Sequence, residues 1–277
     1  MQHTWIVGKT GSGKTTLLHN ILQYSMDNYK ESEVQFYLID SAGQGLEIYQ
    51  DTPYCGVVIQ EENLGKLKAF EELMQGIIQE RKKLFAKYGL TRYEDAVCSE
   101  AACKLPLILV CIDNAGALKT SKVGEEYFYH LADQIRSSTD YGIRYMIFTD
   151  HLNELTARIK QELPDRIALQ LKDRYEYDDV LGIRTKCLPE QWPGRGMMVR
   201  EKEGLTLQIC MEHPWLSAEE RYQEYREKIE KCKEQGDYSW TKKFPSLDET
   251  ETYADFCKKF SSCLLYTSPS PRDRTRS

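Results

Sequence analysis

The sequence lacks any long hydrophobic run. No stretch approaches the roughly 20 apolar residues that a membrane-spanning helix requires. No signal peptide is visible either, because residues 1–8 contain no basic segment that leads into a long apolar run. Of the 277 residues, 41% are hydrophobic and 29% are charged, which is typical of a soluble globular protein. We therefore expect this stretch of chain itself to be cytosolic.

Positive charge is scarce as well. The 43 Asp and Glu residues outnumber the 37 Lys and Arg residues, which gives a net charge of −6 and an isoelectric point of about 5.6. A protein that binds DNA by itself usually presents a basic face. The acidic balance argues against strong autonomous DNA binding, although a local basic patch is compatible with it.

The nine cysteines include no C-x-x-C pair. The two closest, Cys98 and Cys103, have no cluster of histidines nearby that would complete a zinc site. Cys111 and Cys210 lie in apolar stretches. We therefore predict reduced and mostly buried thiols, with neither disulfide bonds nor a structural metal.

What the sequence does contain is a regular alternation of strand-like and helix-like segments. Apolar runs typical of strands are 4–7, 34–40, 56–59, 105–113, 144–149 and 166–171, with a closing hairpin at 197–200 and 205–210 around Gly204. Helical periodicity covers 17–26, 64–88, 125–136 and 152–161. This alternation predicts an α/β fold with a mainly parallel sheet and helices on both faces.

Residues Gly8 to Thr15 match G-x-x-x-x-G-K-[ST], the spacing of a phosphate-binding P-loop. An apolar strand precedes the loop and a helical pattern follows it, which is the context that the motif requires. Glycines let successive backbone N–H groups point at phosphate oxygens, and the helix that begins here adds its positive dipole end. The predicted cradle for ATP comprises Gly8, Lys9, Thr10, Gly11, Ser12, Gly13, Lys14, Thr15 and Thr16.

Two side chains of the loop have chemical roles of their own. Lys14 brings a full positive charge to the β- and γ-phosphates, and the Thr15 hydroxyl can ligate Mg²⁺. The metal also needs a carboxylate at the tip of a neighbouring strand, and the almost unbroken apolar run 105–113 ends in Asp113. We predict Thr15 and Asp113 as Mg²⁺ ligands. The alternative is that Asp113 merely caps a turn.

The residue after Asp113 bears on catalysis. Many ATP-hydrolysing motors of this broad class place Glu there, where it polarises the attacking water. Here it is Asn114, and an amide can orient water but cannot accept a proton at neutral pH. General-base catalysis contributes on the order of 10²–10⁴-fold, so we expect slow hydrolysis unless another carboxylate acts. Asp40 and Asp150 also end predicted strands; either could compensate, but a structural role is the favoured interpretation.

Taken together, these motifs resemble an FtsK/SpoIIIE-type RecA-like P-loop ATPase domain over residues 3–211. Within that family the chain looks most like the EssC/EccC ATPases of type VII secretion. That likeness rests on the turn at 193–196 (PGRG) and on the segment 240–247, which is similar to their interdomain linker. Further segments that carry the resemblance are 6–18, 34–40, 80–82, 88–89, 141–149 and 164–170. The resemblance implies a RecA-like fold, and Asn114 fits a degenerate, middle copy of such a domain.

The segment 149–152 and the residue Arg166 are compared with the family's pattern. Where the family's DNA pumps have a T-Q-R-P sensor, this chain has Thr149, Asp150, His151 and Leu152, which puts the coupling of the γ-phosphate to motion in question. Arg166 is the candidate for an arginine presented to a neighbouring subunit's nucleotide, with a strand-end arginine in a surface ion pair as the alternative. The sequence contains nothing like the winged-helix DNA reader of those pumps.

After residue 211 the composition changes. Residues 218–233 predict a highly charged helix with few apolar positions, and residue 235 onward is irregular and polar. We predict an FtsK/SpoIIIE-type ATPase domain at 1–211, a helical linker toward a following domain at 212–263, and a non-native or disordered tail at 264–277. That Ser/Pro/Arg-rich tail resembles read-through of a sequencing adapter, so we expect a fragment of a longer protein.

Three functions are compatible with these motifs. The first is an ATP-driven motor domain that moves exported proteins, and the second is a nucleotide-loaded module that hydrolyses ATP poorly and signals to neighbouring domains. The third is a DNA translocase domain, against which the acidic charge argues. Asn114 and Asp150 favour the second over a fast motor.

The resemblance also implies ligands, partners and a location. The ligands would be ATP and Mg²⁺. The partners would be neighbouring ATPase domains of the same polypeptide, further copies in a homo-hexamer, exported proteins and, with less support, DNA. The location would be the cytoplasmic face of the bacterial membrane, reached only through segments upstream of this chain.

Overall fold

The computed structural model describes residues 2–98, 105–211, 213 and 215–242, which belong to one compact unit. Several features named above lie outside these residues. They are Cys103, the last part of the linker-like segment 240–247, and the tail at 264–277.

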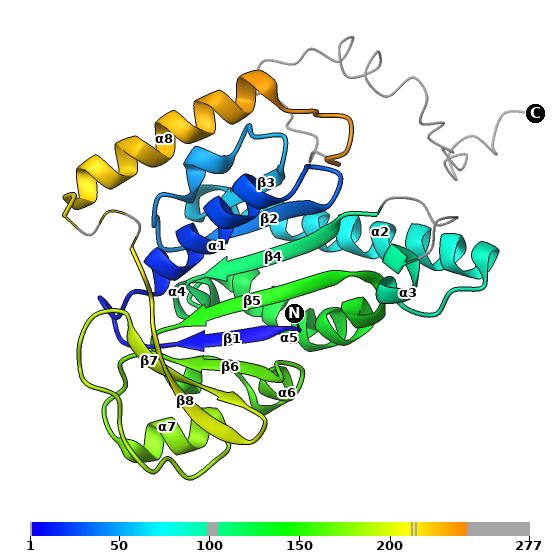
Figure 1. Ribbon diagram of the computed structural model, residues 1–277. Helices are drawn as coiled ribbons and strands as arrows, with labels where there is room; N and C mark the ends of the chain where they lie inside the picture. Colours follow the sequence, from blue (N-terminus) through cyan, green and yellow to red (C-terminus); the bar gives the residue numbers. More distant parts are fainter. Residues whose placement is uncertain (1, 99–104, 212, 214, 243–277) are drawn as a thin grey trace, which may run out of the picture. The chain divides into compact units, whose positions relative to one another are not determined.

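An eight-stranded sheet forms the centre of this unit (Figure 1). Six strands run parallel in the order β3-β2-β4-β5-β1-β6, and β7 and β8 continue the sheet in antiparallel fashion. This confirms the predicted α/β fold with a mainly parallel sheet. The strands are β1 (Thr4–Val7), β2 (Val34–Asp40), β3 (Cys55–Gln60), β4 (Leu107–Asp113), β5 (Ile143–Thr149), β6 (Asp165–Ala168), β7 (Arg195–Arg200) and β8 (Glu203–Gln208).

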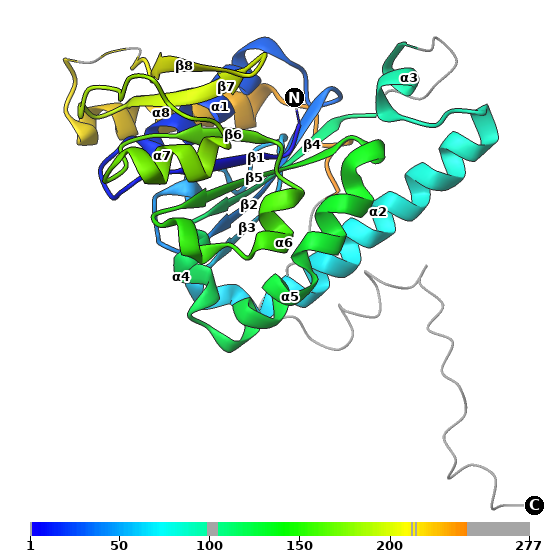
Figure 2. The ribbon, with the colours of Figure 1, turned by 90° about the horizontal axis from the view of Figure 1, so that it is seen from below.

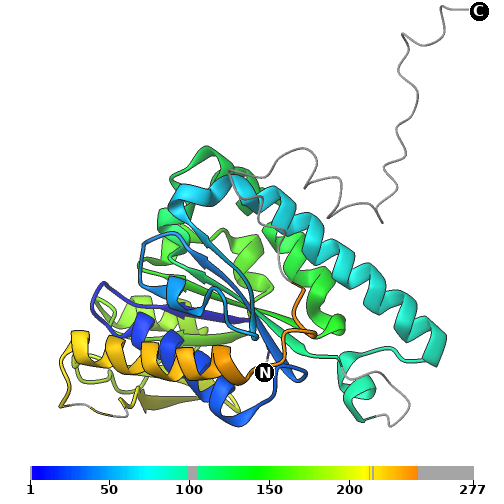
Figure 3. The same cartoon turned by 90° about the horizontal axis from the view of Figure 1, so that it is seen from above.

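Helices cover both faces of the sheet, as predicted. Figures 2 and 3 show α1 and α8 on one face, with α2 and α5 on the other. The α-helices are α1 (Lys14–Asn28), α2 (Leu67–Tyr88), α3 (Tyr93–Cys98), α4 (Ala115–Lys119), α5 (Lys122–Ser138), α6 (Ala157–Gln161), α7 (Arg174–Leu181) and α8 (Ala218–Gln235). Short 3₁₀ helices are η1 (Leu46–Tyr49), η2 (Glu61–Lys66), η3 (Thr139–Tyr141) and η4 (Leu152–Glu154).

The central strands are buried along almost their whole length. Every residue of β2 and β5 is buried, and so is β4 after Leu107. A parallel strand covered on both faces has no solvent side, which is why these strands have nearly continuous apolar sequences. On the α1 face, Leu18 and Leu22 are fully buried in one cluster with Phe36 and Leu38 of β2. This packing fixes the start of α1 relative to the strand ends.

The prediction of one continuous helix over 152–161 is wrong. Residues Leu152–Glu154 form η4, an extended step follows, and α6 begins only at Ala157. The break has a local cause. The Glu154 carboxylate accepts the backbone N–H groups of Asp150 and His151, at 3.0 and 3.2 Å, and Thr156 then caps a separate helix.

The closing hairpin is present, but its turn is not at Gly204. Gly204 pairs with Val199 inside β8, and the two turn residues are Glu201 and Lys202, with φ of 53° and 68°. Left-handed conformations at both central positions match the right-handed twist of the flanking strands. The helix α7 was not predicted at all; Asp173 caps its start and Gly182, with φ of 67°, ends it.

The charged helix α8 packs on the same core as the sheet. Ile229 is 1% exposed, and the ring of Tyr225 stacks on His19 of α1 with centroids 5.2 Å apart. Tyr222 donates to Glu47 of η1, so a few large side chains hold this helix against α1 and η1. That residues 212–263 lead into a following domain stays a prediction.

The described cysteines form no disulfide bond. Only Cys55 and Cys111 of the six described cysteines are buried, so the expectation of mostly buried thiols is wrong for this part of the chain. Cys98, Cys187 and Cys210 are exposed, the last because it lies beyond the end of β8. Across the described ranges, no helix is both long and apolar enough to cross a membrane.

Candidate nucleotide-binding site

The loop between β1 and α1 is anchored to the strands on either side. The backbone N–H of Gly8 donates to Thr149 O at 3.1 Å, and that of Lys9 donates to Gln170 O at 3.0 Å. A Cβ atom at Gly8 would lie 2.6 Å from Ser12 Oγ, so only glycine fits this close crossing of the chain. Gly13, with φ of 102°, supplies the left-handed step into α1.

The start of α1 offers the amides that a phosphate requires. Among the described residues, no protein group accepts a hydrogen bond from the backbone N–H groups of Gly13, Lys14, Thr15 and Thr16. These are the amides that the helix itself cannot satisfy, and they lie at its positive dipole end. The residues present therefore fit the phosphates of a nucleotide.

Lys14 is buried, and its ammonium group has three acceptors. Its Nζ donates to Gly8 O at 2.6 Å, to Lys9 O at 3.3 Å and to Asp150 Oδ1 at 2.6 Å. The side chain is thus held at the loop by its own backbone and by one carboxylate. A phosphate that binds here competes with these acceptors for the ammonium protons.

Asp113 and Thr15 are brought together as predicted. Thr15 Oγ1 lies 3.4 Å from Asp113 Oδ2 and 3.4 Å from Gln44 Oε1. Burial, reinforced by the charge of Asp40, raises the pKa of Asp113 to about 6, while Lys14 and the Thr15 hydroxyl act in the opposite direction. Oxygen donors of this kind are the ligands that Mg²⁺ prefers.

The carboxylate of Asp113 does not cap a turn in the described part of the chain, where no backbone N–H donates to it. Mg²⁺ would replace the weak contact between Thr15 and Asp113 and would favour the ionised carboxylate. The assignment of both residues as metal ligands stays a prediction.

Asn114 uses both ends of its amide group. Its Oδ1 accepts the backbone N–H of Gly116 at 2.8 Å and so caps α4, and its Nδ2 donates to Asp150 Oδ2 at 2.6 Å. The side chain is also nearly buried. These two bonds leave one amide proton and one oxygen lone pair of Asn114 for a water molecule.

The two other strand-end carboxylates differ in role. Asp40 accepts the backbone N–H groups of Gln44 at 2.8 Å and Leu46 at 3.1 Å, which makes it a structural residue of the loop after β2, as favoured above. Asp150 instead lies between Lys14 and Asn114 and bonds to both. It belongs to the site itself.

Arg166 lies away from these residues. It is paired with Trp5 across β1 and β6, near the strand ends opposite the P-loop. Its guanidinium donates to the backbone carbonyls of Leu163, Val180 and Lys160. In this conformation the Arg166 side chain bonds within its own chain, and it forms no ion pair with another described residue. A role toward a neighbouring subunit stays a prediction.

The site residues line a cavity of 370 Å³. Sequence reasoning missed Ala42 and Gln44, which reach it from the loop after β2. The sequence signal was the pair of glycines Gly43 and Gly45, which is typical of a loop with left-handed backbone. In the structure they have φ of 62° and 86°. The lining residues are Thr10, Gly11, Gly13, Lys14, Thr15, Thr16, Ala42, Gln44, Asp113, Asn114 and Asp150.

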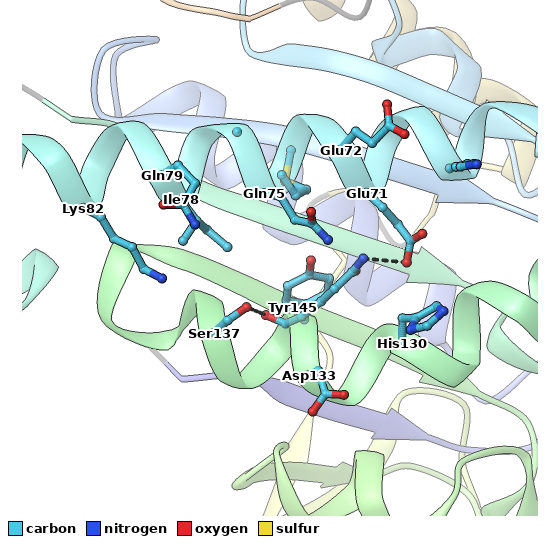
Figure 4. Close-up of a pocket in the computed structure, with 14 residues that line it drawn as sticks. Glu71, Glu72, Gln75, Ile78, Gln79, Lys82, His130, Asp133, Ser137 and Tyr145 are labelled. Atoms are coloured by element: carbon cyan, nitrogen blue, oxygen red, sulfur yellow. Dashed lines mark hydrogen bonds between the residues drawn. The ribbon is translucent and has the colours of Figure 1, made fainter.

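A second cavity, of 730 Å³, lies between α2 and α5 (Figure 4). There Gln134 Nε2 donates to Glu71 Oε1 at 2.6 Å, and Tyr145 of β5 forms part of the wall. The cavity is lined mostly by the interior turns of the two helices, whose N–H groups are used within the helices. It therefore offers no cradle of amides for a phosphate.

The fold and the site together define a RecA-like P-loop ATPase domain. Residues 1–186 match the family model of the FtsK/SpoIIIE family, so the chain belongs to that family.

Comparison with known proteins gives the following relatives. The chain is 24% identical over 184 residues to the type VII secretion system protein EssC of Staphylococcus aureus (strain MRSA252), covering 66% of the chain and 12% of EssC. It is 26% identical over 213 residues to the DNA translocase FtsK of Lactococcus lactis subsp. cremoris (strain MG1363), covering 72% of the chain and 27% of FtsK.

Among solved structures, EssC (ATPases 2 and 3) from Geobacillus thermodenitrificans superposes with a TM-score of 0.78 at 19% identity. The superposition covers 93% of the chain and 49% of the EssC chain. The chain thus spans about half of that structure and a smaller part of the full-length relatives. At this identity the structural likeness establishes the fold alone.

Proposed function

We propose that this chain is a nucleotide-binding FtsK-type domain of a type VII secretion ATPase, which couples ATP binding to protein export and hydrolyses ATP slowly. The observation that carries the proposal is the P-loop, where unpaired amides at the start of α1 lie beside a buried lysine. A cluster of this kind binds the oxygens of a polyphosphate chain through amide hydrogen bonds and one positive charge.

Slow hydrolysis is supported by the residue after Asp113. A general base must accept a proton from water, and Asn114 cannot do so. Asp150 is near enough to be considered, but its two oxygens are already bonded to Lys14 and Asn114.

The export role is supported by the relatives. The EssC protein of Staphylococcus aureus is a type VII secretion protein, and the Geobacillus structure contains two ATPases in one chain. By that analogy the present domain works beside other ATPase domains of the same polypeptide, as a middle copy. The proposal includes exported proteins as substrates, a hexameric assembly and a place at the cytoplasmic face of the membrane.

A binding assay tests the part of the proposal on which the rest depends, namely that the P-loop binds ATP. We expect the protein to bind a fluorescent ATP analogue in the presence of Mg²⁺, and Lys14→Ala to abolish that binding. Lys30→Ala, which removes an exposed lysine beyond the other end of α1, is the matched control and should bind normally. Unchanged affinity in Lys14→Ala would end the P-loop argument.

A DNA translocase domain is the alternative function. It is favoured by the 26% identity to the Lactococcus FtsK protein. We expect little affinity for duplex DNA at physiological salt, because the net charge of −6 offers no general attraction to phosphates. Nanomolar binding of duplex DNA under those conditions would favour the translocase over the secretion role.

A further inference from the structure

Asp150 occupies its place because of the order of the strands. In the sheet, β5 lies between β4 and β1. All three are parallel, so the residues that follow them meet at one edge. Asp150 directly follows β5, Asn114 directly follows β4, and the P-loop follows β1. The side chain of Asp150 is therefore flanked by the two parts of the site that handle phosphate chemistry.

Both carboxylate oxygens of Asp150 have a partner in the site. Oδ1 accepts from Lys14 Nζ and Oδ2 accepts from Asn114 Nδ2, each at 2.6 Å. The side chain of Lys14 is 8% exposed and that of Asp150 is 27% exposed, so the ion pair is only partly screened by solvent. It binds the lysine in the way that an anionic ligand would.

The backbone that carries Asp150 is held in position. Glu154 accepts the N–H groups of Asp150 and His151 with its two oxygens. The Glu154 carboxylate also lies against Gly116, where a Cβ atom would come within 2.5 Å of it. Asp150 is thus fixed against the start of α4, and a change of its backbone position would disturb several contacts.

We propose that Asp150 is a specificity-determining residue that disfavours the terminal phosphate of a nucleoside triphosphate, so that the site binds the diphosphate more tightly. The inference rests on the proposed nucleotide-binding function and deepens it. A diphosphate competes with Asp150 for the Lys14 ammonium group through its β-phosphate alone. A third phosphate adds negative charge at the lysine, where the carboxylate already is, and two anions compete for one ammonium group.

The size of the preference follows from Coulomb's law. Two like charges a few ångströms apart in a partly buried site repel each other. After allowance for Mg²⁺ and salt, this repulsion should weaken binding of the triphosphate by about tenfold or more. We therefore expect the wild-type protein to bind ADP about tenfold more tightly than a non-hydrolysable ATP analogue. Removing the charge of Asp150 should reverse most of that difference.

The experiment is a titration of the full chain with ADP and with a non-hydrolysable ATP analogue, at one fixed Mg²⁺ concentration, by isothermal calorimetry. Asp150→Asn keeps the shape of the side chain and removes its charge. It should shift the ratio of the two dissociation constants about tenfold toward the triphosphate. Asp140→Asn, the same change at an exposed position at the other end of β5, should leave the ratio unchanged.

The outcomes separate this inference from the proposed function. If both nucleotides bind through Lys14 but the wild-type protein prefers the triphosphate, the inference fails and the function stands. The same holds if Asp150→Asn leaves the ratio unchanged. If neither nucleotide binds, both fail. The wild-type preference is measured without any variant, so a misfolded Asp150→Asn protein does not remove the test.

Discussion

Asp113 is expected to destabilise the ligand-free protein, and Asp113→Asn should relieve that effect. The residue is 1% exposed, and burial, together with Asp40, raises its pKa from the ordinary 3.8 to about 6. Because the folded-state pKa exceeds the unfolded value, the folded protein holds on to the proton between these two pH values. The resulting decrease in the free energy of unfolding is absent below about pH 4 and grows as the pH rises through this window. Above about pH 6 it is complete and amounts to about 3 kcal/mol.

The assay is urea unfolding without nucleotide or Mg²⁺, at about pH 4.5 and about pH 8. Asp113→Asn should raise the free energy of unfolding by about 1–3 kcal/mol at the higher pH, since the variant also weakens the contact with Thr15, and by much less at the lower pH. Asp140→Asn removes an exposed carboxylate and should give no such difference between the two pH values. Destabilisation by Asp113→Asn at the higher pH, or an equal effect at both, would refute the reasoning.

Turnover and core packing provide the remaining checks. Slow ATP hydrolysis should rise about tenfold or more in the double variant Asn114→Glu/Asp150→Asn, and less in Asn114→Glu alone, because the new carboxylate would face that of Asp150. Brisk turnover by the wild-type protein in a phosphate-release assay would show that another base operates. Leu22→Ala, at a fully buried position of α1, should lower the free energy of unfolding by about 2–5 kcal/mol, whereas Tyr24→Ala, at a position 61% exposed, should change it little. Equal effects of these two substitutions in chemical denaturation would contradict the packing of α1.

The local part of the site could be predicted from the sequence. The P-loop is a continuous segment whose spacing, preceding strand and following helix are all visible in the chain, and Asp113 ends a run whose burial is apparent from its composition. The central strands were predictable for the same reason. Each has the nearly continuous apolar sequence that burial on both faces permits.

The contacts between distant segments could not be predicted. The bond between Lys14 and Asp150 depends on the order of β4, β5 and β1 in the sheet. That order cannot be inferred from the sequence of any single strand. The break at residue 155 depends on Glu154 turning back to the end of β5 rather than extending a helix. The packing of α8 depends on very few large side chains, so its apolar face is too narrow to stand out from the charged sequence.

The position of a bound nucleotide tests the central claim most directly. In amide NMR spectra of the isotope-labelled protein titrated with ADP and Mg²⁺, the largest shifts should fall on the backbone amides of Gly13 to Thr16, where unpaired N–H groups meet phosphate. Shifts confined to the residues of the α2–α5 cavity, with the amides at the start of α1 unchanged, would contradict it.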